Sequence, residues 1–442
     1  MKFKIFSVID YVLLFCVVLL IGFGIAFVYS SAVDSEGILL SNEYLKQIVW
    51  ALLGFVLLLG LALYDYRLIE RYISWVFIGL LVILVYTRLF GRYVNGAKSW
   101  IGIGEIGIQP SEFGKIIFIL FFAHFLKTSE KESPRRRFFK AIGFFIVPTG
   151  LILLQPDLGT ATVFIPIFFF MCFAAGIKLR YIMFLLLSGA LTILFTMLPV
   201  WQSQIAQVTV PILNILVEPR LRIIITSGVL AITIIGILGK LFYKNNVYYY
   251  WIAYAFTIIF LSLVFSYLAG KVLKEYQLKR LIIFMNPDSD RLGAGWNIIQ
   301  SKIAIGAGGF FGRGFLHGTQ SHYRFLPQQS TDFIFSILSE ELGFIGGFFV
   351  FILYMIMMLE MINIFRKSNN TFGSYIAAGI LGMFFFHFIV NVGMVMGIMP
   401  ITGIPLFFLS YGGSSLWTAM ASIGLLMSIN YRHHDFMDLI GQ

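Results

Sequence analysis

The chain contains about twelve apolar segments, each near the length that crosses a bilayer. Hydrophobic residues make up 59% of the chain and charged residues only 12%. A water-soluble fold with this composition would leave large apolar patches facing water. The sequence therefore predicts an all-α fold, a polytopic membrane bundle of about 12 transmembrane helices. The spans are expected at 11–28, 48–63, 73–90, 116–126, 141–154, 160–175, 181–200, 223–242, 248–269, 344–359, 375–396 and 415–429.

The distribution of basic residues predicts how the bundle is oriented. An even number of spans puts both termini on one side, and cytoplasmic loops are enriched in Lys and Arg. The connection at 127–140 carries Lys131, Arg135, Arg136 and Arg137, and other connections of the same parity are also basic. We expect both termini to be cytoplasmic in a cytoplasmic membrane. The net charge of +11 fits this pattern and requires no nucleic acid partner.

The chain is expected to form a single membrane domain over residues 1–442, with one long extracytoplasmic loop at 271–332. That loop contains the basic residues Lys271, Lys274, Lys279, Arg280, Arg291, Lys302, Arg313 and Arg324. Basic residues on the translocated side oppose the usual topological bias. They therefore indicate a local anionic partner.

One candidate site lies where the span after the first outer loop begins, in the segment 109–115. Glu112 and Lys115 are three residues apart, so a simple intrahelical ion pair is one interpretation. A charged pair inside a span is costly, however, and usually marks a functional cavity. Trp100 in the preceding loop is either an interfacial anchor or part of such a site.

The long outer loop holds two further candidates. The glycine-rich segment 306–314 is either a tight re-entrant turn or a backbone pocket that binds a phosphate beside Arg313. Asp332 stands where a helix is expected to begin, before Phe333 and Ile334. It is therefore either an N-cap or a partly desolvated carboxylate that acts as a base.

Other polar residues of the spans favour structural roles. The segments 155–160 and 410–415 are interpreted first as helix-end devices. His124 and His387 each lie alone among apolar residues, so we interpret them as satisfied core residues and not as metal ligands.

Seven segments taken in order resemble the SEDS family (shape, elongation, division and sporulation). They are 109–115, 155–160, 286–300, 306–314, 327–333, 340–343 and 410–415, and they extend over nearly the whole chain. The segment 315–321 resembles the cell-elongation branch more than the division branch.

The resemblance implies a peptidoglycan glycosyltransferase that polymerises lipid II outside the cytoplasmic membrane. Its implied partners are a class B penicillin-binding protein and other membrane proteins of the elongation machinery. It implies no organic cofactor and a divalent cation, Mg or Mn, as a candidate. By motif match, the catalytic residue is Asp332, and the substrate-binding residues include Lys115, Glu112 and Trp100. Ser111 and Arg313 are also expected to bind the substrate.

The chain departs from the family pattern in three places. Gln328 stands where the family often has Glu, and Ser99 where it often has Arg before the tryptophan. Family members usually have fewer spans, so the residues 201–270 are interpreted as an inserted transmembrane hairpin. Its turn at Lys244, Asn245 and Asn246 is expected to be cytoplasmic.

Two other functions fit a polar site within an apolar bundle. A flippase or transporter of lipid-linked cell-wall precursor would also need a polar cavity. Transporters tend to place charges near the midplane and to show repeat symmetry, whereas the charges here gather at one outer face. A non-catalytic scaffold would explain the bundle but not the concentration of polar motifs.

Overall fold

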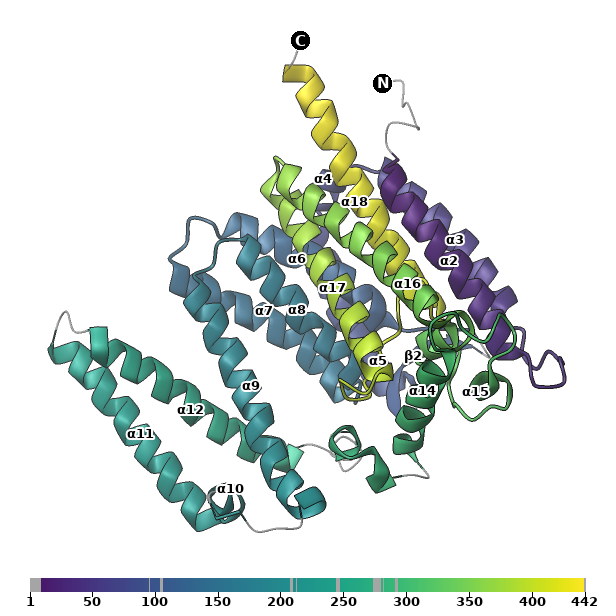
Figure 1. The fold of residues 1–442 in the computed structure, drawn as a ribbon. Coiled ribbons are helices and arrows are strands. Elements are labelled where there is room, and N and C mark those ends of the chain that lie inside the picture. Colours follow the sequence, from purple (N-terminus) through teal and green to yellow (C-terminus); the bar gives the residue numbers. More distant parts are fainter. Residues whose placement is uncertain are drawn as a thin grey trace. The chain divides into compact units, whose positions relative to one another are not determined.

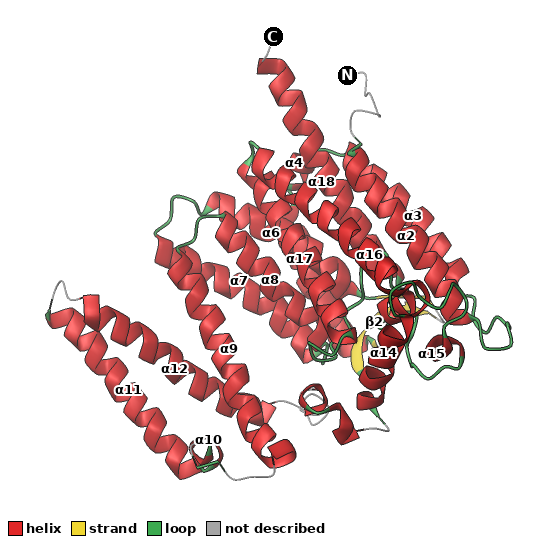
Figure 2. Cartoon of the chain, in the orientation of Figure 1, coloured by secondary structure: helices red, strands yellow, loops and turns green. Residues whose placement is uncertain are grey.

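The computed structural model describes residues 9–94, 96–103, 106–206, 210–211, 213–243, 247–272, 280, 282–290 and 293–440. Most of these residues are helical, as the colouring in Figure 2 shows. They belong to two compact units, one formed by Met1–Ile177 with Asn297–Gln442 and the other by Lys178–Trp296.

The first unit is a bundle of long helices (Figure 1). Its first half contains α2 (Tyr11–Ala32), α3 (Glu43–Leu63), α4 (Tyr66–Ile69), α5 (Ile73–Phe90), α6 (Pro110–Thr128), α7 (Pro134–Leu154) and α8 (Leu158–Ala174). Its second half contains α14 (Ala294–Gly308), whose first residues belong to the other unit, α15 (Thr319–His322), α16 (Ile334–Lys367), α17 (Thr371–Val395) and α18 (Gly413–Ile440).

Each of the expected spans coincides with a helix, and the fold class is confirmed. Within the described residues, nine helices are long and apolar enough to cross a membrane. The other three expected spans correspond to α6, α8 and α18. α8 has only 17 residues, and α6 carries the charged residues Glu112, Lys115 and Lys127.

Helix α17 lies at the core of the first unit. It packs against α6, α8 and α16 (Figure 1), and 72% of its apolar window is buried inside the protein. The rings of Phe384 on α17 and Phe407 in the following loop have centroids 4.9 Å apart. Because α17 is surrounded by protein, its polar side chains must find partners there.

A small antiparallel sheet, absent from the sequence-based prediction, connects α5 to α6. Its strands β1 (Arg92–Val94), β2 (Ala97–Ile103) and β3 (Ile106–Ile108) pair in the order β1-β2-β3. Arg92 is opposite Trp100, and Ile101 is opposite Ile108. The sheet fixes the approach of the chain to the start of α6.

The glycine-rich segment 306–314, at the end of α14, forms backbone hydrogen bonds at a break in helix α16. Gly343 has φ +66° and ψ −160°, so the helix that was expected to start at 344 has an additional helical stretch before this break. The amide of Phe344 donates to the carbonyl of Gly309 at 2.9 Å. A Cβ on Gly312 would lie 2.1 Å from the carbonyl oxygen of Glu341, so only glycine fits there. This geometry supports the interpretation of the segment as a tight turn.

The second unit contains α9 (Leu179–Trp201), the π-helix η1 (Gln202–Ala206), α10 (Asn214–Val217), α11 (Pro219–Phe242), α12 (Val247–Val272) and the 3-10 helix η2 (Pro287–Asp290). α11 and α12 lie side by side in the hairpin expected from the sequence (Figure 1). The guanidinium of Arg222 on α11 donates to the carbonyl of Leu263 on α12 at 3.0 Å.

Parts of two sequence predictions fall outside the described residues. The turn of the hairpin, at Lys244, Asn245 and Asn246, is one of them. In the long loop at 271–332, the residues 273–279, 281 and 291–292 are also outside. The sidedness of the turn and the assignment of domains remain predictions.

Candidate active site

The centre of the candidate site is Lys115, a lysine of α6 with no exposed surface. Its ammonium Nζ lies 2.7 Å from Oε1 of Glu112, one helical turn earlier. It also lies 3.1 Å from Nε2 of His387 on α17. A desolvated ammonium is costly unless it is paired and hydrogen-bonded. Lys115 therefore faces the interior of the protein and not lipid.

The start of α6 is held by the loop that joins α7 to α8. Gln109 precedes Pro110, whose fixed φ suits the first turn of a helix. Nε2 of Gln109 donates to Oδ2 of Asp157 at 2.7 Å. Oδ1 of Asp157 accepts from the amide of Thr160 at 3.1 Å and so caps α8. The segment 155–160 is a helix-end device, and it also positions the helix that carries Lys115.

Helix α17 links Lys115 to the backbone of Asp332. His387 and Asn391 are four residues apart on α17 and lie on one helix face. Nδ2 of Asn391 donates to the carbonyl of Asp332 at 3.2 Å and to the carbonyl of Ile404 at 2.8 Å. One face of α17 thus contacts both the buried ammonium and the turn that carries the predicted base.

Asp332 lies in the turn just before α16, and it is half-buried. The N-cap position of α16 is occupied by Phe333, so Asp332 is one residue short of the position that the capping interpretation requires. Oδ2 of Asp332 is 3.7 Å from the point that a Cβ on Gly403 would occupy. The carboxylate of Asp332 therefore lies beside Gly403 in the loop after α17.

The segment 410–415 ties the two parts of the site together. The amide of Tyr411 donates to the carbonyl of Ser330 at 2.8 Å, next to the Asp332 turn. The hydroxyl of Ser414 accepts from the amide of Gln109 at 3.2 Å, at the start of α6. On α3, Nε2 of Gln47 donates to the carbonyl of Ser410 at 3.2 Å. These bonds fix the Asp332 turn relative to α6.

Several buried polar atoms of α6, α17 and the loop after α17 have no hydrogen-bond partner within the described part of the chain. They are Oγ of Ser111, Oε2 of Glu112, Oδ1 of Asn391 and Oγ1 of Thr402. An unsatisfied buried polar group costs about 1–3 kcal/mol. Two of them, Oγ of Ser111 and Oε2 of Glu112, lie within four residues of Lys115 on the same helix, so water or a polar ligand beside these turns would satisfy them.

Two predicted site residues belong to other elements. Trp100 lies half-buried in β2, with its ring 3.0 Å from the point that a Cβ on Gly107 would occupy. Arg313 is exposed, and its guanidinium donates to Oγ1 of Thr319 at 2.8 Å. The structure therefore groups Ser111, Glu112 and Lys115 on α6 and links them to Asp332 through α17, whereas Trp100 belongs to β2 and Arg313 to the loop before α15.

The described residues give no direct support for a metal site. No group of three or more His, Cys, Asp or Glu side chains that could hold a metal ion occurs among them. A divalent cation remains a prediction.

Sequence reasoning missed His387 and Asn391. The interpretation of His387 as a satisfied core residue agrees with its burial and its two partnered ring nitrogens, but it did not identify Lys115 as one of the partners. The available signal was their spacing, because two polar residues one turn apart in an apolar helix share a face. That spacing does not identify the partner.

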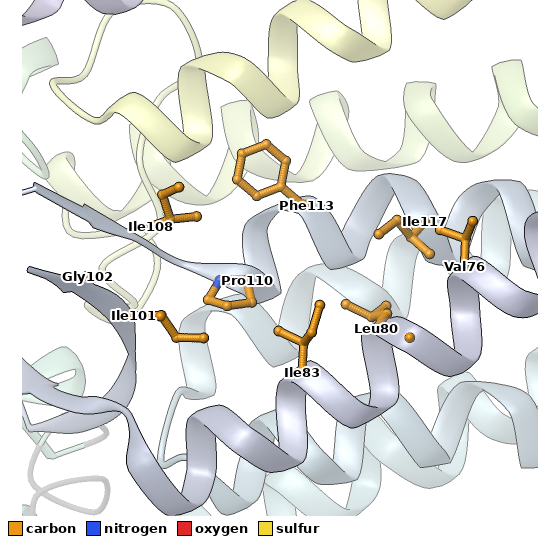
Figure 3. A pocket seen from close by; sticks show the side chains of 10 residues that line it. Val76, Leu80, Ile83, Ile101, Gly102, Ile108, Pro110, Phe113 and Ile117 are labelled. Atoms are coloured by element: carbon orange, nitrogen blue, oxygen red, sulfur yellow. The ribbon is translucent and has the colours of Figure 1, made fainter.

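An apolar cavity of about 880 Å³ opens beside the first turns of α6. In Figure 3 its walls are formed by α5, the β2–β3 hairpin and α6. Three residues of α6 line this cavity: Pro110, Phe113 and Ile117. The polar residues Glu112 and Lys115 of the same helix are not part of its lining. One helix thus borders both an apolar cavity and a polar site.

Comparison with known proteins identifies relatives along the whole chain. The model of the FtsW/RodA/SpoVE family, described as "Cell cycle protein", matches residues 11–212 and 201–435. The peptidoglycan glycosyltransferase RodA of Treponema pallidum is 54% identical over 98% of this chain and 100% of its own length. The stage V sporulation protein E of Bacillus subtilis is 32% identical over 95% of this chain and 96% of its own length.

Two solved structures share the fold. One, described as "Structural coordination of polymerization and crosslinking by a peptidoglycan synthase complex", has a TM-score of 0.68 and 24% identity, covering 96% of this chain and 98% of that chain. The other, the rod shape determining protein RodA of Thermus thermophilus, has a TM-score of 0.58 and 21% identity, covering 96% and 97%. The family match and the full-length relatives establish that this chain belongs to the FtsW/RodA/SpoVE family, the SEDS proteins.

Proposed function

We propose that this multi-pass membrane protein is a peptidoglycan glycosyltransferase that polymerises lipid II on the outer face of the cytoplasmic membrane during cell elongation. The observation that carries the proposal is the buried Lys115 ammonium, held by the same face of α17 that contacts the Asp332 turn. The 54% identity to a protein named peptidoglycan glycosyltransferase RodA supports the activity.

The reaction requires a base and a positive charge. The 4-hydroxyl oxygen of the acceptor sugar forms a bond to the anomeric carbon of the lipid-linked donor. The bond from that carbon to undecaprenyl pyrophosphate breaks, and its electron pair leaves with the pyrophosphate. In our proposal Asp332 accepts the hydroxyl proton, and Lys115 stabilises the charge that develops on the leaving group. Glu112 and Ser111 orient polar groups of the substrate beside Lys115.

The apolar cavity supports a lipid-linked substrate. Its volume of about 880 Å³ and its lining by Leu80, Ile83 and Phe113 suit part of a polyprenyl chain. The pyrophosphate would lie toward Lys115 and the tail toward this cavity. A water-soluble sugar nucleotide would have no use for such a surface.

The orientation and the partners are also part of the proposal. The basic connection at 127–140 and its equivalents support cytoplasmic termini. A structural relative is described as a complex that coordinates polymerisation and crosslinking, which supports a class B penicillin-binding protein as partner. Trp100 and Arg313, in β2 and in the loop before α15, would contact more distant parts of the substrate.

A flippase is the main alternative, and one reconstitution separates the activities. The purified chain, with and without its crosslinking partner, is placed in vesicles that contain fluorescent lipid II. A polymerase converts the label into long glycan strands, whereas a flippase changes only the leaflet that the label occupies. A scaffold does neither.

The substitution Asp332→Asn tests the assignment of the base. Loss of a general base costs about 10²–10⁴-fold in rate. Asn keeps the size of the side chain but cannot accept the proton. We therefore expect Asp332→Asn to bind its partner normally and to lose polymerisation. If this variant, folded and in its complex, polymerised lipid II at the parental rate, Asp332 would not be the base.

A further inference from the structure

We infer that His387 is a positioning residue for glycosyl transfer, which directs the ammonium of Lys115 toward the leaving pyrophosphate. The inference rests on the proposed function, because it takes Lys115 as the group that stabilises the leaving group. It concerns a residue 272 positions away from Lys115 in the sequence.

The contacts of His387 fix its tautomer. Nδ1 lies 2.9 Å from the carbonyl oxygen of Pro405, and a carbonyl can only accept a hydrogen bond. Nδ1 therefore carries the proton. Nε2 lies 3.1 Å from Nζ of Lys115, and an ammonium can only donate. Nε2 must be bare, so His387 is neutral and accepts from Lys115.

The ring of His387 cannot easily turn away. The side chain is 1% exposed. Its ring stacks on Phe407, with centroids 3.8 Å apart and planes at 19°. Pro405 and Phe407 belong to the same loop, whose Ile404 carbonyl is held by Asn391. The acceptor presented to Lys115 is therefore preorganised by the loop after α17.

This acceptor gives the ammonium a direction without adding charge. A lysine ammonium has three donors on a flexible four-carbon stem. Oε1 of Glu112 and Nε2 of His387 accept two of them, and the contacts found within the described residues leave the third for a ligand. Glu112 alone would let the ammonium pivot, whereas two acceptors from two helices fix the third N–H. The unpartnered atoms Oγ of Ser111 and Oε2 of Glu112 are the adjacent places for a polar ligand.

Two substitutions separate the two contacts of the ring. In His387→Gln, the amide end takes the place of Nε2, and its carbonyl can accept from Lys115. In His387→Asn, the shorter amide takes the place of Nδ1 and can donate to the carbonyl of Pro405, but it does not reach Lys115. If His387 only holds the loop through the carbonyl of Pro405, His387→Asn should preserve activity. If His387 positions Lys115, His387→Gln should preserve activity instead.

The assay is polymerisation of fluorescent lipid II by the full chain in complex with its crosslinking partner. A misplacement of about 1 Å in a catalytic group can cost about 10²-fold in rate. We expect His387→Asn to lose about that much in kcat with little change in KM, and His387→Gln to recover most of it. His124→Asn is the matched control, because His124 lies on α6 beside Glu70 and away from Lys115.

The outcomes are distinct. Parental kcat in His387→Asn, or an active Asn variant beside an inactive Gln variant, would overturn the inference. Nitrogen-15 NMR of the histidine-labelled parental chain tests the same inference and does not depend on whether a variant folds. His387→Gln serves to assign the signal of His387. That signal should report a neutral ring with a bare Nε2, and a protonated Nε2 would also overturn the inference.

A parallel variant separates this inference from the proposed function. In Glu112→Gln/Lys115→Met, both charges of the pair are removed. If that chain polymerised normally, the proposed role of Lys115 itself would be wrong. If it were inactive while His387→Asn kept the parental kcat, the inference about His387 alone would fail.

Discussion

Replacing Lys115 with methionine should destabilise the fold as well as stop polymerisation, because it leaves a buried carboxylate without its cation. Glu112 is 4% exposed, and Oε1 has Nζ of Lys115 as its ion-pair partner. Oε2 has no hydrogen-bond partner within the described residues. Removing one member of a buried ion pair typically costs about 3–5 kcal/mol. We expect the free energy of unfolding of Lys115→Met to fall by an amount in this range.

The matched control removes both charges. Replacing a buried pair with hydrophobic residues of similar volume is often neutral or stabilising by about 1–4 kcal/mol, and Gln in place of Glu removes the charge while keeping the shape of the side chain. Glu112→Gln/Lys115→Met should therefore regain most of the lost stability. It should remain inactive, because the cation proposed for the leaving group is still missing.

Both variants are measured by denaturant unfolding in detergent and by polymerisation of fluorescent lipid II at equal concentrations of folded protein. If Lys115→Met were as stable as the double variant, the loss of the cation would not leave Glu112 as a costly buried charge. The reasoning from burial would then be refuted. If the double variant were stable and active, the catalytic part would be refuted.

Three further predictions concern the cavity, α17 and the break in α16. A Cβ on Gly79 would have open space, so Gly79→Phe should fold, fill the cavity and raise KM more for lipid II with a long tail than for a short-tailed analogue. Gly143→Phe, which also has open space but does not line the cavity, should change neither KM. Asn391→Leu leaves two carbonyls without their donor and should cost about 1–3 kcal/mol of unfolding free energy for each that stays buried. Gly312→Ala should destabilise more than Gly309→Ala in thermal unfolding, because both have positive φ but only a Cβ on Gly312 would meet the backbone of α16.

The membrane spans were predictable because the bilayer imposes one length and one composition on every helix that crosses it. The bounds were less predictable. The helix expected from 344 has an additional helical stretch from Ile334, because Gly343 permits a break that the glycine-rich turn fills with backbone hydrogen bonds. The β1–β3 sheet was missed because its strands are short and include Gly102 and Gly107, which weaken the alternation of apolar and polar residues.

Some contacts of the candidate site follow from spacing along one helix, and others depend on tertiary structure. Glu112 and Lys115 are i,i+3 on one helix, so their pairing could be predicted. The contact of Lys115 with His387 joins residues 272 apart, and no periodicity encodes it. The same holds for Asn391, whose contact with the carbonyl of Asp332 requires the packing of α16 on α17. A polar residue in a buried helix indicates that a partner exists but not which one it is.

The two faces of α6 explain why a lipid-linked substrate suits this fold. Glu112 and Lys115 face the protein interior, where α17 supplies their partner. Pro110, Phe113 and Ile117 follow an i, i+3, i+7 pattern and line the apolar cavity. A pyrophosphate with a polyprenyl tail likewise has a charged part and an apolar part, which are covalently joined. In the proposed function, the ammonium on one face of α6 would therefore contact the pyrophosphate, and the apolar wall on another face would contact the tail.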